Sequence, residues 1–327
     1  MHHLIFLLLL LGRFSSAFAA EPPLLSFPLA CTVGRDCWVV NYFDHNPGKG
    51  FQDYRCSWRG YDGHTGIDIS IGTLGRMNAG VSVLAAADGI VIGGRDGEED
   101  KGIAHGEVLT TKECGNGLRL DHGGGWITQY CHMKKGSVRF QTGMKVRRGD
   151  VLGLVGLSGM TEFPHLHIEV QYYDKQHPVD PFTGSVTSCQ QPPRPLWDTE
   201  TLARMPYRPV QIFSSGAADR IPDRTALQQG TGEARRISAT SELFIAYFQT
   251  YSVPKGATFI IDVTAPDGTP FLRREIVQER SQMQAYVYAG KKRGTAPWPT
   301  GTYRFTAVVQ GGGKDIKDTQ DTEITVY

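Results

Sequence analysis

Histidine and carboxylate side chains that could bind a metal gather in three short motifs. His64 and Asp68 are four residues apart, His165 and His167 are two apart, and His132 lies between these pairs. Two imidazoles and one carboxylate, with a fourth position left to water, form the ligand set of a catalytic zinc site. Zinc in such a site polarises a carbonyl and lowers the pKa of its bound water to about 7. Spare histidines can then move a proton or stabilise an oxyanion, so the pattern indicates metal-assisted hydrolysis.

The element that must carry His165 and His167 is predicted to be a strand. Side chains alternate with period two along a strand, so both imidazoles should enter one cavity. The spacing alone leaves open which of the two binds the metal. The apolar residues between and after them should point the opposite way, into the core: Leu166, Ile168 and Val170.

The rest of the chain predicts a mainly β protein of two domains. Glycine is dense from Gly48 to Gly159, and short apolar runs there are separated by turn residues without a sustained helical period. This favours an antiparallel-sheet domain. The proline-rich run 190–195 suits a stiff linker, and a short helix is expected at 198–205. Strand signals at 243–248, 258–264, 303–309 and 322–327 then predict a small β-sandwich-like domain.

The N-terminus is typical of a secretory signal peptide. An apolar run at residues 4–11 leads to the cleavage pattern Ala17-Phe18-Ala19, and this run is too short to span a bilayer. We therefore expect an exported protein, periplasmic or secreted, that does not span the membrane. Basic residues number 34 against 33 acidic ones, a balance that gives no argument for nucleic-acid binding.

All six cysteines follow the signal segment, and an even count in an oxidising compartment predicts up to three disulfides. Cys31 and Cys37 are close enough to close a small loop, and we expect that pair to form. The other pairings stay open: Cys56, Cys114, Cys131 and Cys189. A metal role is disfavoured because no two cysteines have the Cys-x-x-Cys spacing.

Several motifs in order resemble the lysostaphin-type (LytM-like) zinc endopeptidases that cleave peptidoglycan peptides. The resemblance spans roughly residues 64–170. It rests on these motifs: the His64-x-x-x-Asp68 pair, the Asp121-His122-Gly123 turn, Tyr130 to Met133, the Gly149-Asp150 turn, Gly156 to Gly159, and Pro164-His165-Leu166-His167.

The resemblance implies that His64, Asp68 and His167 bind Zn²⁺ and that His132 and His165 are the catalytic histidines. It also implies a β-rich peptidase fold with a groove over the sheet, and peptidoglycan peptides as substrate. The expected division is a signal peptide at 1–20, an N-terminal segment at 21–53, a LytM-like zinc peptidase domain at 54–189, a linker at 190–236 and a β-sandwich-like accessory domain at 237–327.

The sequence departs from this family's pattern at two positions and in one segment. Phe163 stands where glycine is common, and Met133 replaces the more usual leucine. Neither change removes a ligand. The segment 93–114 is longer than expected for a tight connection and is predicted to be a loop beside the cleft.

Other polar and aromatic residues have simpler interpretations. We expect His122 to be structural, His45 and His177 to be loop residues, and His105 to lie in the long loop, where a role in lining the groove is less favoured. Glu169 is expected to point away from the metal and is not assigned as a general base. The remaining groups are expected to be a solvated acidic loop at 98–100 and core aromatic residues, rather than a sugar platform, at Tyr286, Trp298 and Tyr303.

Two other functions stay open. One is a non-enzymatic activator of other cell-wall hydrolases, which the complete ligand set disfavours. The other is a secreted protease that acts on proteins. The scissile bond, the oligomeric state, and whether segment 21–53 blocks the groove are not determined by the sequence.

Overall fold

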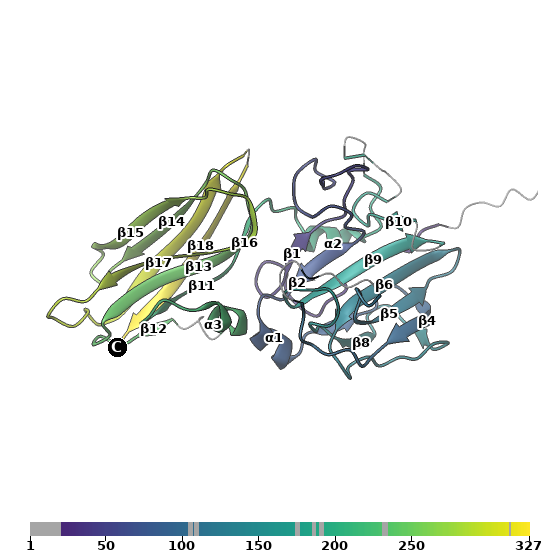
Figure 1. Ribbon diagram of the computed structural model, residues 1–327, viewed down its shortest axis with the longest axis horizontal. Coiled ribbons are helices and arrows are strands. Elements are labelled where there is room, and N and C mark those ends of the chain that lie inside the picture. The colour runs from purple at the N-terminus through teal and green to yellow at the C-terminus, as the bar shows by residue number, and fades with distance from the viewer. Residues whose placement is uncertain are drawn as a thin grey trace, which may run out of the picture.

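The computed structural model describes residues 21–103, 107, 111–173, 177–184, 188–189, 193–230, 235–313 and 315–327. The expected signal peptide (1–20), His105 and the run 190–192 lie outside these residues. Among the described helices, none has the length and apolar character needed to cross a membrane. The described residues form two β-rich domains that lie side by side (Figure 1), which confirms the mainly β prediction.

The N-terminal domain is built on one antiparallel sheet in the order β1-β2-β9-β6-β5-β4-β7, with β10 also paired to β9. A smaller sheet pairs β3 with β8. The bounds of its elements are β1 (Trp38–Asn41), β2 (Ile67–Ser70), α1 (Leu74–Ala79), β3 (Ser82–Leu84), β4 (Gly89–Arg95), β5 (Asn116–Asp121), β6 (Trp126–Met133), β7 (Lys145–Val146), β8 (Val151–Leu154), β9 (His165–Tyr172), β10 (Pro178–Val179) and α2 (Thr199–Arg204).

Alternation along β9 separates core from site, as predicted. Leu166, Ile168 and Val170 are completely buried in the domain core, whereas the histidines occupy the opposite face of the strand. The predicted short helix is also confirmed as α2, where the Asp198 carboxylate accepts a hydrogen bond from Thr201 N and so caps the first turn.

The segment 21–53 is part of this domain. Leu25, Phe27 and Leu29 belong to its core, and β1 forms the edge of the main sheet by pairing with β2. Burying these apolar side chains removes them from water, which ties the segment to the domain without a separate core of its own.

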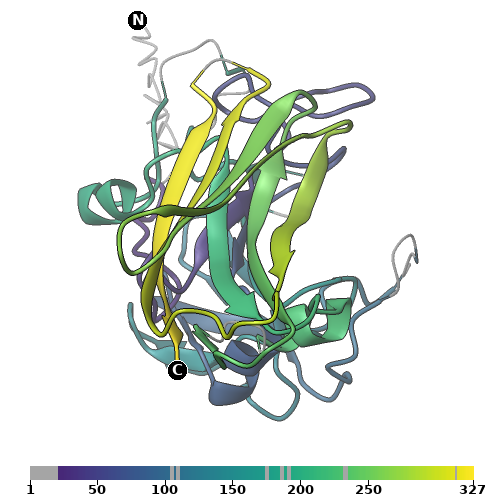
Figure 2. The same cartoon turned by 90° about the vertical axis from the view of Figure 1, so that its left-hand side faces the viewer.

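The C-terminal domain is a two-layer sandwich, and in Figure 2 it faces the viewer, in front of the N-terminal domain. One sheet has the order β11-β13-β16 and the other β12-β18-β17-β14-β15. The bounds are β11 (Gln211–Ala218), α3 (Arg224–Gln229), β12 (Arg236–Ile237), β13 (Leu243–Val253), β14 (Ala257–Thr264), β15 (Pro270–Val277), β16 (Gln282–Lys292), β17 (Gly301–Gly311) and β18 (Lys317–Val326).

Part of the segment expected to be a linker, 190–236, belongs to the sandwich. Strand β11 pairs with β13 along most of its length, and Ile212 and Ala217 lie in the sandwich core. The strand itself contains polar residues, Ser214 and Ser215, which are buried, and these masked it in the sequence.

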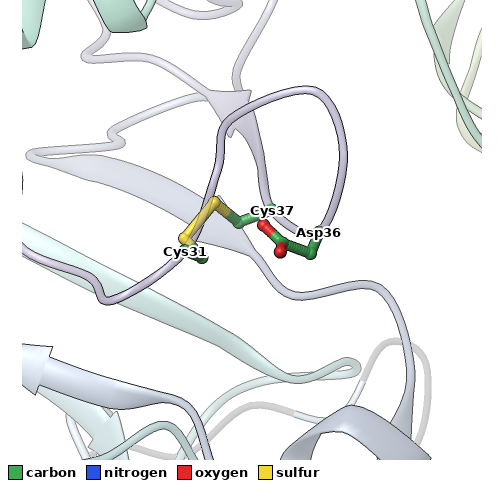
Figure 3. A group of neighbouring side chains, drawn as sticks. All are labelled: Cys31, Asp36 and Cys37. Atoms are coloured by element: carbon green, nitrogen blue, oxygen red, sulfur yellow. A yellow bond between two sulfur atoms is a disulfide. The ribbon is translucent and has the colours of Figure 1, made fainter.

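Three disulfides cross-link the N-terminal domain. Cys31–Cys37 is the pair expected from sequence, and Figure 3 shows it beside Asp36. The other two pairs are Cys56–Cys189 and Cys114–Cys131. All six cysteines are in disulfides, so none offers the thiolate that binds a metal.

Candidate metal centre

Strands β2 and β9 bring the predicted ligands to one point. The two strands pair with Asp68 opposite His167, and the loop before β2 carries His64. His64 Nε2 lies 3.2 Å from both Asp68 Oδ1 and His167 Nδ1, and His167 Nδ1 lies 2.9 Å from Asp68 Oδ1. His64 and Asp68 are each only 2% exposed. Three donor atoms from three positions of the chain therefore converge in a nearly dry site.

The spacing of these donor atoms fits zinc. Bonds of about 2.0–2.2 Å at tetrahedral angles place neighbouring ligand atoms roughly 3.3 Å apart. The three observed separations, 2.9, 3.2 and 3.2 Å, are close to that value. Nitrogen and oxygen donors without sulfur match a catalytic zinc ligand set, so these residues could hold the ion.

Residues around the three donor atoms of His64, Asp68 and His167, called here the donor triangle, orient the ligands. His64 Nδ1 donates to the carbonyl of Tyr42 at 2.7 Å, which leaves His64 Nε2 as the unprotonated nitrogen of the neutral ring. On the far side of the His167 ring, Nε2 lies 3.6 Å from Glu169 Oε2, and Glu169 in turn accepts from Thr65 Oγ1 at 2.9 Å. Both imidazoles thus have their coordinating nitrogens turned toward Asp68.

Asn41 holds the second oxygen of the carboxylate. Its Nδ2 donates to Asp68 Oδ2 at 2.7 Å in a fully buried contact. A register shift between Val39 and Asn41 places the amide opposite Asp68 on the neighbouring strand. A bulge of this kind redirects a side chain without ending the pairing. Asp68 Oδ1 is therefore left to face the two histidines.

Two further histidines adjoin the triangle. The His165 and His132 ring centroids are 4.6 Å apart, and His165 Nε2 lies 3.4 Å from Asp68 Oδ1. His165 Nδ1 donates to the carbonyl of Phe163 at 2.9 Å, and His132 Nδ1 donates to that of Ser158 at 2.8 Å. Because carbonyls only accept, the proton in each of these contacts is on Nδ1 of the histidine.

The backbone at His132 takes an uncommon conformation. Its φ is +61°, in the left-handed region that residues with a Cβ seldom adopt. His132 N donates to Cys114 O, and the disulfide Cys114–Cys131 joins the same two segments one residue away. Gly156 N donates to His132 O. The conformation is thus imposed by its surroundings, as is common at functional sites.

The charges of the site are strongly coupled. Burial disfavours an ionised Asp68, but His64, His165 and His167 outweigh burial and hold the pKa of Asp68 well below its usual range. Burial lowers the pKa of His167, yet Asp68 and Glu169 together raise it to about 9. Burial and the neighbouring imidazoles lower the pKa of His132 far below that of a free histidine. In the metal-free protein, the site therefore holds an ionised carboxylate beside a neutral His132.

The structure brings together all five predicted site residues and corrects one expectation. Glu169 does not point away from the site: its carboxylate approaches the outer side of the His167 ring. Residues two apart on a strand share a face, so the same periodicity that places His165 with His167 should have placed Glu169 with them. Burial favours the neutral form of Glu169, but His167 outweighs it and lowers the pKa of Glu169.

Sequence reasoning missed two other residues near the ligands. Asn41 has no signal in the sequence, because its contact depends on a strand pairing and a bulge. Tyr61 lies three positions before His64, and its ring centroid is 4.5 Å from that of His64. Tyr61 is 45% exposed, so it forms part of the solvent-facing rim of the site.

Two other histidines of the described chain lie elsewhere. His122 Nδ1 donates to Asp88 O at 2.6 Å, which supports the structural role expected of it. His45 Nε2 lies 2.8 Å from a carboxylate oxygen of Asp180, in a buried pair. Neither is in the group that converges on Asp68.

The acidic loop and the aromatic residues also have structural contacts. Asp100 accepts from Leu157 N, and Glu98 pairs with Lys112 at 2.7 Å. Trp298 and Tyr303 lie in the sandwich core, as expected, with their exposed fractions at 8% and 0%. Tyr286 differs: it is partly exposed and stacks on Tyr288 at a centroid distance of 5.5 Å.

The antiparallel-sheet domain thus carries a His-Asp-His donor group that could hold a metal ion, with two further histidines beside it, the arrangement expected from the resemblance. Residues 62–181 match the family model described as Peptidase family M23. This part of the chain, which holds all five predicted site residues, is therefore similar to the M23 family.

Three relatives each match about a third of the chain. The cell division protein DipM of Caulobacter vibrioides is 35% identical over 33% of this chain and 17% of its own length. The peptidoglycan DD-endopeptidase ShyA of Vibrio cholerae is 30% identical over 33% of this chain and 20% of its own. The DD-carboxypeptidase/endopeptidase Mpg of Neisseria meningitidis is 33% identical over 36% of this chain and 22% of its own length. The match thus spans about a fifth of each relative.

Proposed function

We propose that this protein is a zinc-dependent endopeptidase that hydrolyses peptide bonds of bacterial peptidoglycan outside the cytoplasm. The observation that carries the proposal is the convergence of His64 Nε2, Asp68 Oδ1 and His167 Nδ1 within 3.2 Å of one another. The names of ShyA and Mpg support a bond between D-amino acids as the target. Three disulfides support an oxidising compartment.

In this proposal, His64, Asp68 and His167 hold Zn²⁺, which supplies Lewis acidity toward the scissile carbonyl and toward water. Asp68 contributes the negative charge of the ligand set, and Asn41 keeps its second oxygen engaged. Glu169 and the Tyr42 carbonyl fix the ring orientations of the two imidazoles.

His132 and His165 are the proposed catalytic histidines. Each is held at Nδ1 by a carbonyl, so Nε2 is the nitrogen left for proton transfer. A neutral Nε2 can accept a proton from the attacking water, and the resulting N–H can donate to the oxyanion or the leaving amine. Burial and the neighbouring imidazoles lower the pKa of His132, which keeps its ring unprotonated at neutral pH.

The test combines metal analysis with cleavage. The mature protein is purified, its zinc content measured, and peptide release from purified sacculi followed with and without chelator. One zinc per chain and chelator-sensitive release are expected. His132→Ala serves as the control that keeps the metal and loses turnover.

Other outcomes contradict the proposal in distinct ways. Zinc without release from sacculi would favour a regulatory protein over an enzyme. Rapid cleavage of an unstructured protein with no release from sacculi would favour a general secreted protease. A protein without metal would refute the ligand assignment.

A further inference from the structure

The C-terminal domain reaches the catalytic face of the N-terminal sheet. A separate apolar cluster joins Trp38 and Val40 of β1 to Phe213 of β11 and Tyr251 of β13, with Phe163 packed against it. Trp38 lies opposite Ser70, and Ser70 lies opposite His165. The cluster therefore lies at the end of the strands that carry the candidate site.

Further contacts fix the two domains together. Gln211 Nε2 donates to Val39 O at 2.7 Å across the interface. Helices α1 and α3 approach so closely that a Cβ added at Gly75 would lie 2.6 Å from Gln229 O. Contacts of this kind, distributed along the boundary, hold one sheet of the sandwich in a defined position against β1 and α1.

A line of rings leads from the C-terminal domain to His165. Phe213 stacks on Tyr251 with a centroid distance of 4.1 Å, and Tyr251 lies 6.3 Å from Phe163. Phe163 in turn lies 4.7 Å from the His165 ring at an interplanar angle of 30°. The His165 ring thus packs against both Phe163 and His132, with the His132 centroid at 4.6 Å.

Tyr251 also makes a hydrogen-bonded connection to the same segment. Its Oη lies 2.7 Å from Ser70 Oγ, and Ser70 Oγ lies 3.5 Å from Pro164 O. Burial raises the pKa of Tyr251, so its hydroxyl stays protonated and can donate to Ser70. Ser70 can then donate to Pro164, although at the long limit for a hydrogen bond. Ring packing and hydrogen bonding therefore both lead from Tyr251 to the residues on either side of the Pro164–His165 peptide.

We propose that Tyr251 is a positioning residue for His165, so that the active site is completed by the C-terminal domain. Tyr251 acts through Phe163 and Ser70, which hold the segment whose carbonyl fixes the His165 tautomer. Its effect on turnover rests on the proposed endopeptidase function. Its effect on the geometry of the His165 ring does not.

The test compares Tyr251→Ala, which removes the ring, with Tyr251→Phe, which removes only the hydroxyl. Tyr303→Phe is the matched control, because Tyr303 is a buried tyrosine of the same domain whose hydroxyl donates to Pro299 O, away from the site. We expect kcat to fall about tenfold in Tyr251→Ala with little change in KM, since small displacements of a catalytic group are costly. Tyr251→Phe should keep most of the wild-type kcat, and Tyr303→Phe should leave kcat unchanged.

Two additional readouts separate positioning from general destabilisation. Zinc content should stay at one per chain, and the ring ¹⁵N resonances of His165 should shift in Tyr251→Ala but not in Tyr303→Phe. In a double-mutant cycle, Phe163→Ala should make the effect of Tyr251→Ala much smaller, because both changes break the same connection.

Unchanged kcat and unchanged His165 resonances in both Tyr251 variants would overturn the proposal. A wild-type protein without peptidase activity would refute the proposed function. In that case, a His165 shift in Tyr251→Ala would still establish the positioning role.

Discussion

The two domains bury different kinds of residues. Buried ionisable side chains of the N-terminal domain include Asp53, Arg59 and Asp180 in addition to the candidate site. The buried polar residues described in the sandwich are uncharged, and its strands run to 11 residues around an apolar core. All three disulfides lie in the N-terminal domain.

This difference indicates how a domain with buried charged groups is stabilised. Burying a charge costs free energy unless it is paired, and a site of convergent imidazoles is paired fully only when it holds a metal. Covalent cross-links offset such a cost by restricting the unfolded chain. The described residues of the sandwich include no such group, and their packing is mainly apolar. The two domains should therefore respond differently to the same perturbation.

Removal of a ligand should have the largest effect. Asp68→Ala is expected to abolish zinc binding and to bring sacculus cleavage below detection, because three imidazoles lose their common carboxylate. His132→Ala should keep one zinc and lower the cleavage rate by about 10²–10⁴-fold. Zinc analysis and initial rates measure both. Full zinc content in Asp68→Ala would refute its role as a ligand.

Reduction of the disulfides should destabilise the N-terminal domain more than the C-terminal domain. The Cys56–Cys189 bond links residues 133 apart, for which the chain-entropy model gives about 5 kcal/mol. Hydrogen exchange followed by mass spectrometry should show lost protection in the N-terminal sheet after reduction, with β13, β14 and β17 still protected. Equal loss of protection in both domains would contradict the comparison.

Loss of the Asn41 contact should weaken the metal site without removing a ligand. Asn41→Ala is expected to lower zinc affinity by about 10–100-fold, the usual effect of removing a partner that orients a ligand. Competition with a chromophoric chelator measures this change. Asn116→Ala, at a buried asparagine that contacts none of the ligands, is the control and should leave zinc affinity unchanged.

A small pH dependence is expected from His122. Burial lowers its pKa below the ordinary 6.5. The unfolded chain therefore binds a proton first as pH falls, and the free energy of unfolding should decline below about pH 6.5. Urea unfolding at about pH 5.5 and 7.5 should show a smaller decline for His122→Gln than for wild type. Identical declines would show that His122 does not contribute.

The sequence predicted the parts of the site that local rules control. Period two along β9 placed His165 and His167 on one face, and motif order identified the other members. It did not predict Asn41, whose position depends on a bulge in a strand 27 residues from Asp68. Nor could it predict Tyr251, because its contact with Ser70 joins positions 181 residues apart in different domains. Such contacts depend on the assembled fold.

The Cys114–Cys131 bond also bears on when the candidate site is fully formed after synthesis. It ties the residue before His132 to the residue whose carbonyl receives the His132 amide. A newly made chain in a reducing cytoplasm has free thiols there and lacks this tie. Under the proposed function, His132 is locked in place only after the thiols are oxidised. Full hydrolytic competence would then be acquired on arrival at the cell wall, and the oxidising compartment would act as the maturation signal.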